Sequence, residues 1–563
     1  MTRHDETSPR ANRASKAAPG VFAAAGLIAV VTLGARVFGV GRWLVFSQSV
    51  GTTCVGSVYQ AANQLPNVVF EVAAGGALAA VAVPIIAGHL VRGDQAQANQ
   101  TASAMLTWAL TVLVPLSLLM ALAARPLSTL LVDGQNCSGS AELMASMLVV
   151  FAPQIALYGV GIVLGGVLQA HRRFLAAALA PLLSSVVVMA AYLMYAALAQ
   201  GKGNDLARLP SQASTVLAAG TTLGVVTLSL PLLVPLHRTG IRLRPTWTFP
   251  DGVARRAGAL AGAGILALVA QQIAVLVTLW VSQHRGGTGT LNVYTYVQAV
   301  YLLPYAVLAV PVAISAFPAL ATGSEQAAMA RDSDQASLMR AQWTLASSAR
   351  AILVATCVGG AVLFAVASPI GVFFSALDAG RNSPAGKQAL GALPDALSAF
   401  APGLVGFGLA ALFTRALYVH GRPVVAGGVV ALGWLIAAIV PLLVLHDGAG
   451  PRNTLQSLGL ASSFGMTAAA IGLVVAVRRA WGPRAFWGFG RTAGVALGAG
   501  AVAATVGRVI AAWVHPEGLA AGAVVAVLVS VAVATLCAIL IWVGDRESAQ
   551  LVVATIRRRS RER

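Results

Sequence analysis

Long apolar runs, separated by short polar segments, dominate this sequence. A helix of about 20 apolar residues is needed to cross the hydrocarbon core of a membrane, and runs of this length recur almost throughout the chain. The pattern predicts an all-α polytopic membrane protein with fourteen transmembrane helices. The centres of these spans lie near residues 33, 72, 112, 157, 187, 225, 270, 306, 362, 407, 434, 467, 502 and 531.

The composition also favours a membrane protein. The chain is 58% hydrophobic and only 10% charged, with a mean hydropathy of +0.79, whereas a soluble domain carries about 25% charged residues. Of its Lys and Arg residues, 26 fall on the side that holds both termini and 8 on the other side. Both termini are therefore predicted to be cytoplasmic. The basic C-terminal tail favours contact with anionic lipid headgroups over nucleic-acid binding, because it lacks interleaved aromatic residues.

The sequence repeats itself at an offset of 249 residues. The segment FAPQIALYGVGIVLGGVLQAHRR at 151–173 aligns without a gap with FAPGLVGFGLAALFTRALYVHGR at 400–422, and Leu-Pro at 65–66 recurs at 303–304. With six spans in each repeat, the two lobes have the same orientation and are related by an axis along the membrane normal.

The repeat and the charge pattern divide the chain into six parts. No signal peptide is evident, because the first apolar run leads directly into a full span. The parts are a disordered cytoplasmic tail at 1–19, an N-lobe of six spans at 20–238, a cytoplasmic linker at 239–254, a C-lobe of six spans at 255–480, two further spans at 481–544 and a basic cytoplasmic tail at 545–563.

Signatures of soluble enzymes are missing from the sequence. It contains no GxxxxGK[ST] phosphate loop, no HExxH motif and no CxxC pair, so a secondary carrier or a flippase is favoured over an enzyme, with no metal and no cofactor. Two of the four cysteines, Cys357 and Cys537, lie in apolar runs. Cys54 and Cys137 lie in loops predicted to be outside the cytoplasm, where they form either a disulfide or two separate thiols.

Polar side chains inside the predicted spans are the candidates for substrate contact, because a charge at the bilayer centre costs at least ~2.5–3.5 kcal/mol on insertion scales. Arg36 and Arg42 in span 1 lie about 9 Å apart along the helix axis and about 120° apart around it. Alternatively, Arg42 extends to the outer interface and Arg36 pairs with Glu71. Amides in span 2 recur at i, i+3 and i+7, on one helical face. The candidate substrate-binding residues are Arg36, Arg42, Gln60, Asn63, Asn67, Glu71 and Gln272.

Several short motifs resemble those of a known family. RVFGVGR at 36–42, LPN at 65–67, GAL at 76–78 and VP at 83–84 resemble the opening of the MurJ (MviN) family of lipid II flippases, whose pattern runs SRxLGxxRD, LPN, EGA and VP. The resemblance covers about residues 20–480. Further matching motifs are Pro153-Gln154-Ile155, Arg173-Phe174, Gln272-Ile273, Leu303-Pro304 and Arg415-Ala416-Leu417-Tyr418.

The resemblance implies both a fold and a function. The fold is that of the multidrug/oligosaccharidyl-lipid/polysaccharide (MOP) exporter superfamily, with a V-shaped cavity between the two lobes and a lipid-tail groove at the two extra helices. The implied substrate is lipid II, the undecaprenyl-linked peptidoglycan precursor, moved from the inner to the outer leaflet of the bacterial cytoplasmic membrane by alternating access. The expected partners are this anionic precursor, membrane lipids and cell-wall synthesis enzymes, without nucleic acid. The energy source is membrane potential or a coupling cation.

The sequence also departs from the family pattern. Trp43 replaces the acidic residue after the second arginine, Phe70 or Glu71 stands where an arginine follows Leu-Pro-Asn, Gly75 replaces an acidic residue and Ala299 replaces an arginine. Only Arg36 and Arg42 match the arginines of the family's cavity. The alternatives are a flippase for another polyprenyl-linked glycan, a multidrug/cation antiporter of the same superfamily and a non-transporting scaffold for wall synthesis.

Overall fold

The computed structural model describes residues 34, 38–132, 137–171, 173–238, 240–250, 253–329, 335–547 and 550. Arg36, the predicted N-terminal tail and most of the predicted C-terminal tail lie outside the described residues. Within them, every regular element is a helix. Eleven helices are long and apolar enough to cross a membrane, or twelve if one bent pair counts as a single span.

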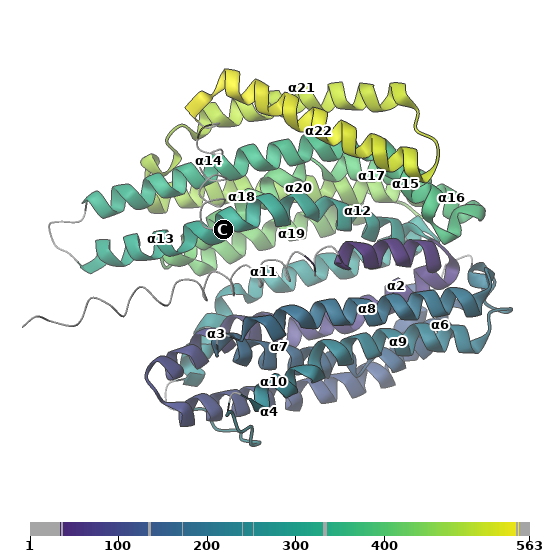
Figure 1. The fold of residues 1–563 in the computed structure, drawn as a ribbon, viewed down its shortest axis with the longest axis horizontal. Coiled ribbons are helices and arrows are strands. Elements are labelled where there is room, and N and C mark those ends of the chain that lie inside the picture. Colours follow the sequence, from purple (N-terminus) through teal and green to yellow (C-terminus); the bar gives the residue numbers. More distant parts are fainter. Residues whose placement is uncertain are drawn as a thin grey trace, which may run out of the picture.

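The first half of the chain forms one helical lobe, at the bottom of Figure 1. It begins with a helix at residues 38–49. The elements that follow are α2 Cys54–Phe70, η1 Glu71–Gly75, α3 Gly76–Val91, α4 Gln95–Leu122, α5 Ala124–Val132, α6 Ser140–Phe151, α7 Gln154–Ala170, α8 Phe174–Ala199, η2 Lys202–Asn204, α9 Ser211–Ser229, η3 Leu230–Leu232 and α10 Leu233–His237. The helix at 38–49 and the chain of α2, η1 and α3 correspond to predicted spans 1 and 2, so a total of fourteen spans is compatible with the structure.

The second half forms another lobe and ends in two helices on its far side (Figure 1). The second lobe contains α11 Val253–Val281, η4 Ser282–Gly286, α12 Thr290–Pro304, η5 Tyr305–Ala309, α13 Val310–Met329, α14 Gln335–Ala365, α15 Ala367–Leu377, η6 Ala379–Asn382, α16 Pro384–Gly391, α17 Leu393–Phe400, α18 Gly403–Val419, α19 Pro423–Val444 and α20 Gly450–Trp481. After η7 Pro483–Phe486 come α21 Phe489–Val514 and α22 Gly518–Gly544.

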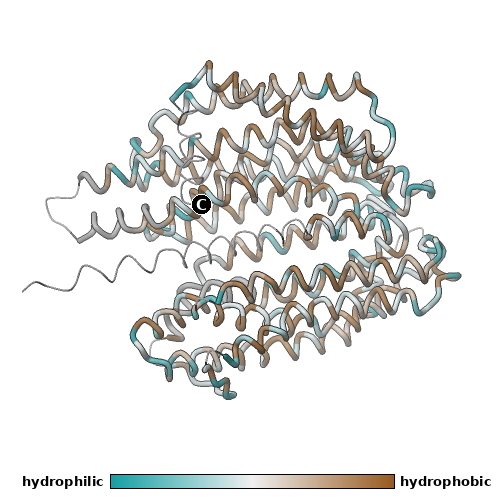
Figure 2. Tube along the Cα trace, in the orientation of Figure 1, coloured by the Kyte–Doolittle hydropathy of each residue, from teal (hydrophilic) through white to brown (hydrophobic). Residues whose placement is uncertain are grey.

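The long helices run between two ends of the molecule. We call one end the disulfide end, because it holds Cys54 and Cys137, and the other the linker end, because it holds the segment at 240–250 between the lobes. The disulfide end lies at the right of Figure 1 and the linker end at the left. Figure 2 shows hydrophobic residues along the helices and hydrophilic residues mainly toward the ends, the distribution expected of a membrane bundle.

The ninth span differs from the sequence-based expectation, and the tenth contains a bend. The ninth was predicted to centre near residue 362, but the long helix is Leu338–Ala365 and α15 is a separate short helix. Hydropathy does not register a change of helix direction, so the apolar run across both helices shifted the predicted centre. The tenth is bent by 49° between Pro384–Phe400 and Gly403–Val419. Pro402 lies at this break, where a proline interrupts the helical hydrogen bonds.

A π-helix interrupts the corresponding span in each lobe. In the first lobe η1 follows α2, which contains Pro66, and in the second lobe η5 follows Pro304 directly. The prolines belong to the repeated Leu-Pro pairs. A π-helix is rare, and short insertions of this kind inside α-helices are frequent at functional sites. Both lobes therefore contain a local change of helical register at an equivalent place.

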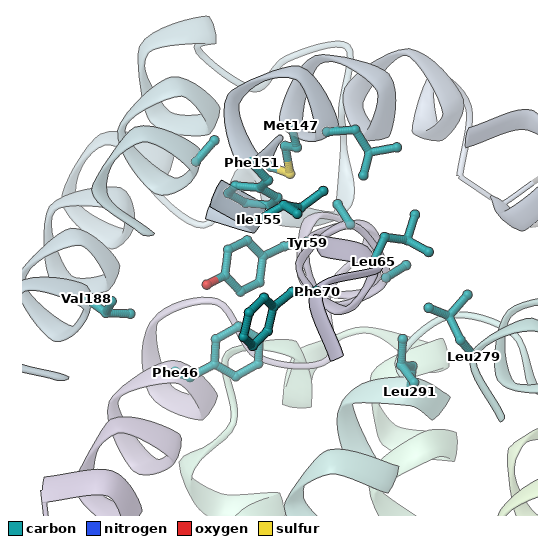
Figure 3. Packing of buried hydrophobic residues seen from close by; sticks show 14 of the residues in the cluster. Phe46, Tyr59, Leu65, Phe70, Met147, Phe151, Ile155, Val188, Leu279 and Leu291 are labelled. Atoms are coloured by element: carbon teal, nitrogen blue, oxygen red, sulfur yellow. The ribbon is translucent and has the colours of Figure 1, made fainter. Parts of the chain in front are cut away.

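The hydrophobic core is continuous between the lobes near the disulfide end. One buried cluster contains most of the first lobe together with Leu279, Leu291 and Phe374 of the second lobe. Figure 3 shows Tyr59 of α2 with Phe46 and Phe151 around it. The ring centroids of Tyr59 and Phe46 are 5.7 Å apart. A second cluster joins the rest of the second lobe to α21 and α22. Apolar packing thus closes the molecule at one end.

Candidate functional site between the lobes

A buried carboxylate connects the two lobes at the disulfide end. Asp378 follows α15, and its side chain is fully buried. From the first lobe it accepts hydrogen bonds from Ser47 Oγ (2.8 Å), the Thr52 backbone N–H (2.7 Å) and Thr52 Oγ1 (2.8 Å). From the second lobe it accepts hydrogen bonds from the Tyr296 hydroxyl (2.8 Å) and the Gly380 N–H (2.8 Å). Five donors satisfy this carboxylate, and three of them come from the opposite lobe.

Neighbouring hydrogen bonds extend the contact between the lobes at Asp378. We call the hydrogen bonds of Asp378 and these neighbouring bonds together the interlobe seal. The Asn292 amide donates to the Gly51 carbonyl (2.5 Å), and the Gly289 N–H donates to Ser57 Oγ (2.7 Å). Gly51 has φ +60, and a Cβ there would lie 2.5 Å from Oδ1 of the Asp378 carboxylate. Only glycine fits this position, because a side chain would be strained and would separate the lobes.

The two predicted extracytoplasmic cysteines lie beside the seal. The structure contains a disulfide between Cys54 and Cys137, with Cα atoms 6.1 Å apart. It ties the start of α2 to the segment before α6, and Cys137 Sγ lies 3.4 Å from Thr288 Oγ1 of the second lobe. The thiols of Cys357 and Cys537 are free and buried, as expected of small apolar side chains.

Arg42 lies on the linker side of the seal. Ser47 follows it by five residues on the same helix, which corresponds to about 7.5 Å along the axis. Its guanidinium lies 5.4 Å from the Trp43 ring, and it interacts electrostatically with Tyr59, Tyr158 and Tyr192. Arg42 Nε is buried without a hydrogen-bond partner, and no carboxylate among the described residues forms an ion pair with Arg42. The site therefore holds a cation that no described acidic residue neutralises.

A cavity of about 500 Å³ lies within the first lobe, toward the linker end. Asn67 and Glu71 line it from α2 and η1, Tyr158 and Gln169 from α7, and Pro181 from α8. Because Tyr158 also lies near Arg42, the polar residues of the cavity and the cation belong to one region. Glu71 is half-buried, and no ion pair joins its carboxylate to a described cation.

The remaining predicted residues are less closely associated with this cavity. Gln60 is buried, and its side-chain nitrogen has no partner in the described part of the chain. Asn63 is half-buried on the same helix. Gln272 is buried in α11, and Arg36 lies outside the described residues. Of the predicted polar face of span 2, Asn67 and Glu71 are the members that line the cavity.

The second lobe contains its own cation at the position equivalent to Gly166. Arg415 lies in α18, and its Nη1 donates to the Ala411 carbonyl (2.5 Å). It interacts electrostatically with Tyr305 and Tyr418. The repeat aligns Arg415 with Gly166, which lines the cavity of the first lobe. The glycine allows α7 to pack closely on α3, because a Cβ at Gly166 would lie only 2.7 Å from the Ala82 Cβ.

A second, apolar cavity of about 740 Å³ lies between the second lobe and α21. Its lining is almost entirely hydrophobic and comes from α14, α18, α20 and α21. We call it the apolar groove. Residues that line it include Phe364, Val405, Ile471, Leu497, Gly500 and Ala501. Its size and chemistry suit a hydrocarbon chain better than a polar solute.

Sequence reasoning missed Asp378. A lone Asp before a helical turn is usual, because its side chain caps the turn by accepting a hydrogen bond from a backbone N–H, as Asp378 does for η6. Ser47 and Thr52 lie 331 and 326 residues away from it in sequence. No local pattern connects residues at such separations, and the two repeats do not supply this contact.

Two lobes in parallel orientation, sealed at one end and holding an intramembrane cation, are the arrangement of a transporter. Solved structures with this fold include "Lipid II flippase MurJ, inward closed conformation", with a TM-score of 0.67, 16% identity and coverage of 92% of this chain and 98% of that one. An inward-facing multidrug resistance MATE family transporter of the MOP superfamily has a TM-score of 0.62, with 14% identity and coverage of 81% and 98%. The chain therefore shares its fold with these two transporters.

The family follows from the sequence comparison. The model of the family described as "Lipid II flippase MurJ" matches residues 46–548, and the chain belongs to that family. A probable lipid II flippase MurJ of Rhizobium meliloti (strain 1021) is 26% identical over 298 residues, which cover 52% of this chain and 53% of the relative. A probable lipid II flippase MurJ of Synechocystis sp. (strain ATCC 27184 / PCC 6803 / Kazusa) is 26% identical over 40% of this chain and 42% of the relative. The chain thus spans about half the length of the curated relatives it matches.

Proposed function

We propose that this protein is a flippase that moves lipid II from the inner to the outer leaflet by alternating access. The observation that carries the proposal is Arg42, a cation inside the bundle on the linker side of the interlobe seal. No described carboxylate forms an ion pair with it. An uncompensated charge within a membrane is costly, so it requires a functional partner of opposite charge. Membership of the MurJ family supports lipid II as the source of that charge.

The diphosphate of lipid II is the group that Arg42 binds. A guanidinium donates paired, charge-assisted hydrogen bonds to phosphate oxygens and stays protonated when partly buried. Arg36, which matches the other arginine of the family motif, is the second proposed ligand. The cavity beside Tyr158 then receives part of the sugar–peptide headgroup, for which Asn67 and Gln169 supply hydrogen-bonding groups.

The prenyl chain of the substrate follows the apolar groove. Keeping the tail in an apolar environment while the head crosses the bundle avoids moving a long hydrocarbon through a polar cavity. The lining of the groove, which includes Phe364 and Leu497, is apolar and therefore suits a segment of such a chain.

Alternating access requires the interlobe seal to open while the linker end closes. Two of the π-helices, η1 and η5, are the proposed hinge points, because each changes the helical register within about two turns after a proline, Pro66 or Pro304. Membrane potential or a coupling cation supplies the energy, since the complex carries charge across the bilayer.

The proposed orientation places the disulfide end outside and the linker end, with both termini, in the cytoplasm of a bacterial cell. Reporter fusions after residues 95, 175, 245 and 335 test this topology, and each should report a cytoplasmic location. Fusions after residues 135, 205, 285 and 385 should report an outside location. A single inverted pair would overturn the proposed topology.

Measurement of lipid II in each leaflet tests the function. In a strain depleted of the native protein, Arg42→Ala at normal membrane level should let lipid II accumulate in the inner leaflet and stop wall synthesis. Arg42→Lys should restore only part of the flux, because an ammonium lacks the planar fork. Arg208→Ala is the matched control, since Arg208 is exposed and pairs with Asp205.

Other outcomes of this experiment identify the alternatives. Accumulation of a different polyprenyl-linked glycan, with lipid II unaffected, would mean that the substrate assignment is wrong. Arrest of wall synthesis without accumulation of any lipid-linked precursor would indicate a scaffold. Full complementation by Arg42→Ala would remove Arg42 from the substrate site.

A further inference from the structure

The segment between the lobes forms a basic pocket on the surface of α4 at the linker end. The pocket has a volume of about 450 Å³ and is lined by residues of α4 and of the segment at 240–250. Arg242 and Arg244 are exposed and contribute its charge. The other lining residues are Ala96, Asn99, Gln100, Ser103 and Thr246.

Hydrogen bonds hold this segment in a defined position along α4. The Arg244 backbone N–H donates to Ser103 Oγ (3.0 Å), and the Thr246 N–H donates to Thr107 Oγ1 (3.1 Å). The Gln100 amide also donates to the Thr248 carbonyl (3.2 Å). The two arginines are therefore presented by an ordered backbone, and their side chains are not needed to hold it. A preorganised site loses less entropy when it binds a ligand.

No acidic residue in the described part of the chain forms an ion pair with Arg242 or Arg244. Ser103 and Thr246 add hydroxyl groups that can donate to an anion. The chemistry of the pocket therefore suits a phosphate group, which offers several acceptor oxygens and negative charge.

Two tryptophans place this pocket next to the membrane surface. Trp247 packs edge-on against Trp108 of α4, with ring centroids 5.5 Å apart, and the Trp108 indole donates to the Trp247 carbonyl (2.9 Å). Their exposed fractions are 45% for Trp108 and 56% for Trp247. Exposed tryptophans concentrate at the level of lipid headgroups, where the ring is apolar and the N–H is polar.

The geometry of α4 gives the depth of the pocket relative to these rings. Exposed apolar residues of α4 continue from Trp108 through Val112 and Leu119 to Leu122, as on a lipid-facing surface. Ser103 lies five residues before Trp108, which corresponds to about 7.5 Å along the helix axis toward the polar side. That is the level at which a phospholipid carries its phosphate. Figure 1 shows α4 at the outer edge of the first lobe, where lipid has access.

We propose that Arg242 and Arg244, with the hydroxyl and amide groups of α4, bind the phosphate of an anionic phospholipid at the linker end. The lipid stabilises the docked position of the segment that connects the two lobes. This site is separate from the cavity beside Tyr158 in the first lobe, and it does not depend on which substrate the protein moves.

Binding of short-chain phosphatidylglycerol to the purified full-length protein in detergent tests the proposal. Thermal unfolding reports binding, because a ligand that binds only the folded state raises the midpoint. The midpoint should rise with dihexanoyl phosphatidylglycerol and should respond little to dihexanoyl phosphatidylcholine or inorganic phosphate. In the double variant Arg242→Gln/Arg244→Gln the apparent Kd for phosphatidylglycerol should rise at least tenfold. The anchoring bond of residue 244 uses its backbone N–H, so this variant keeps the docked backbone.

A matched control is available on the same end of the molecule. Arg478→Gln/Arg479→Gln removes two exposed arginines at the end of α20 that line no pocket, and it should bind phosphatidylglycerol like the unmodified protein. Equal loss in both double variants would show a general effect of net charge and would overturn the site. An equal rise of the unfolding midpoint with free phosphate would mean that the site binds a soluble anion and not a lipid.

A second measurement covers the case in which the double variant is unstable. In nanodiscs of phosphatidylcholine with added brominated phosphatidylglycerol, the unmodified protein should lose part of its tryptophan fluorescence by quenching. Trp247→Phe should remove that part of the quenching, and each single variant, Arg242→Gln or Arg244→Gln, should reduce it. Unchanged quenching in all three variants would exclude the proposed position.

Discussion

Removal of one hydrogen bond across the interlobe seal should shift the protein toward the state that is open at the disulfide end. Ser47→Ala removes the 2.8 Å bond from Ser47 Oγ to the buried Asp378 carboxylate. A hydrogen bond to a charged group contributes about 1.5–3 kcal/mol. Since 1.4 kcal/mol is a factor of ten in an equilibrium constant, the ratio of open to closed molecules should increase about 10- to 100-fold.

A matched variant separates opening of the seal from damage to the carboxylate site. Ser383→Ala removes the hydroxyl that donates to the Gly380 carbonyl (2.9 Å) beside the same carboxylate, and Ser383 and Gly380 belong to the same lobe. It therefore weakens the surroundings of Asp378 without removing a hydrogen bond between lobes. Ser47→Ala should open the seal and Ser383→Ala should leave it closed.

Labelling of an introduced thiol measures the opening. Asn63→Cys places a thiol on the half-buried polar side of α2, and the native cysteines are either joined in a disulfide or buried. The rate of reaction with a membrane-impermeant maleimide, added to intact cells, should rise severalfold or more with Ser47→Ala. Equal rates with and without Ser47→Ala, or an equal increase with Ser383→Ala, would refute the assignment of this hydrogen-bond network as the gate.

Three further changes test other parts of the structure. Cys54→Ala/Cys137→Ala should lower the free energy of unfolding by up to about 4–5 kcal/mol, because the disulfide closes a loop with a separation of 83 residues in the unfolded chain. Thermal unfolding measures this change. Alkylation of Cys54 and Cys137 in the unmodified protein without prior reduction would exclude the disulfide. Ala501→Trp fills the apolar groove and should slow lipid transport in a leaflet assay, whereas Val506→Trp on the same exposed helix, outside the groove lining, should not. Glu71→Gln should keep the protein at a normal membrane level, because no described cation pairs with Glu71; loss of folded protein would show that the carboxylate neutralises a buried charge.

Much of the fold was predictable because membrane spans and repeats leave local signals. Unpaired backbone groups are costly in lipid, so the apolar runs had to form helices, and their lengths had to match the bilayer. The repeated Phe-Ala-Pro segments became α7 and α18, which are each 17 residues long and begin directly after Pro153 and Pro402. The resemblance to the MurJ family, drawn from short motifs, was confirmed by the family match over 46–548.

The hydropathy pattern could not show where helices change direction. The π-helices η1 and η5, the bend at Pro402 and the separate helix α15 all lie within apolar sequence. Each depends on how neighbouring helices satisfy backbone groups and fill space. The same is true of the cavity beside Tyr158, whose lining residues come from α2, α3, α7 and α8 among other elements.

The sequence by itself determined the class of protein, the approximate spans and the presence of Arg42 as a charge inside a predicted span, because these follow from the cost of placing polar groups in lipid. Tertiary structure alone decided that Ser47 and Thr52 meet Asp378 across more than 320 residues, and that Arg242 and Arg244 share a pocket with α4. Contacts of this kind depend on the packing of one lobe against the other and of the connecting segment on α4. Spacing along the chain carries no record of them.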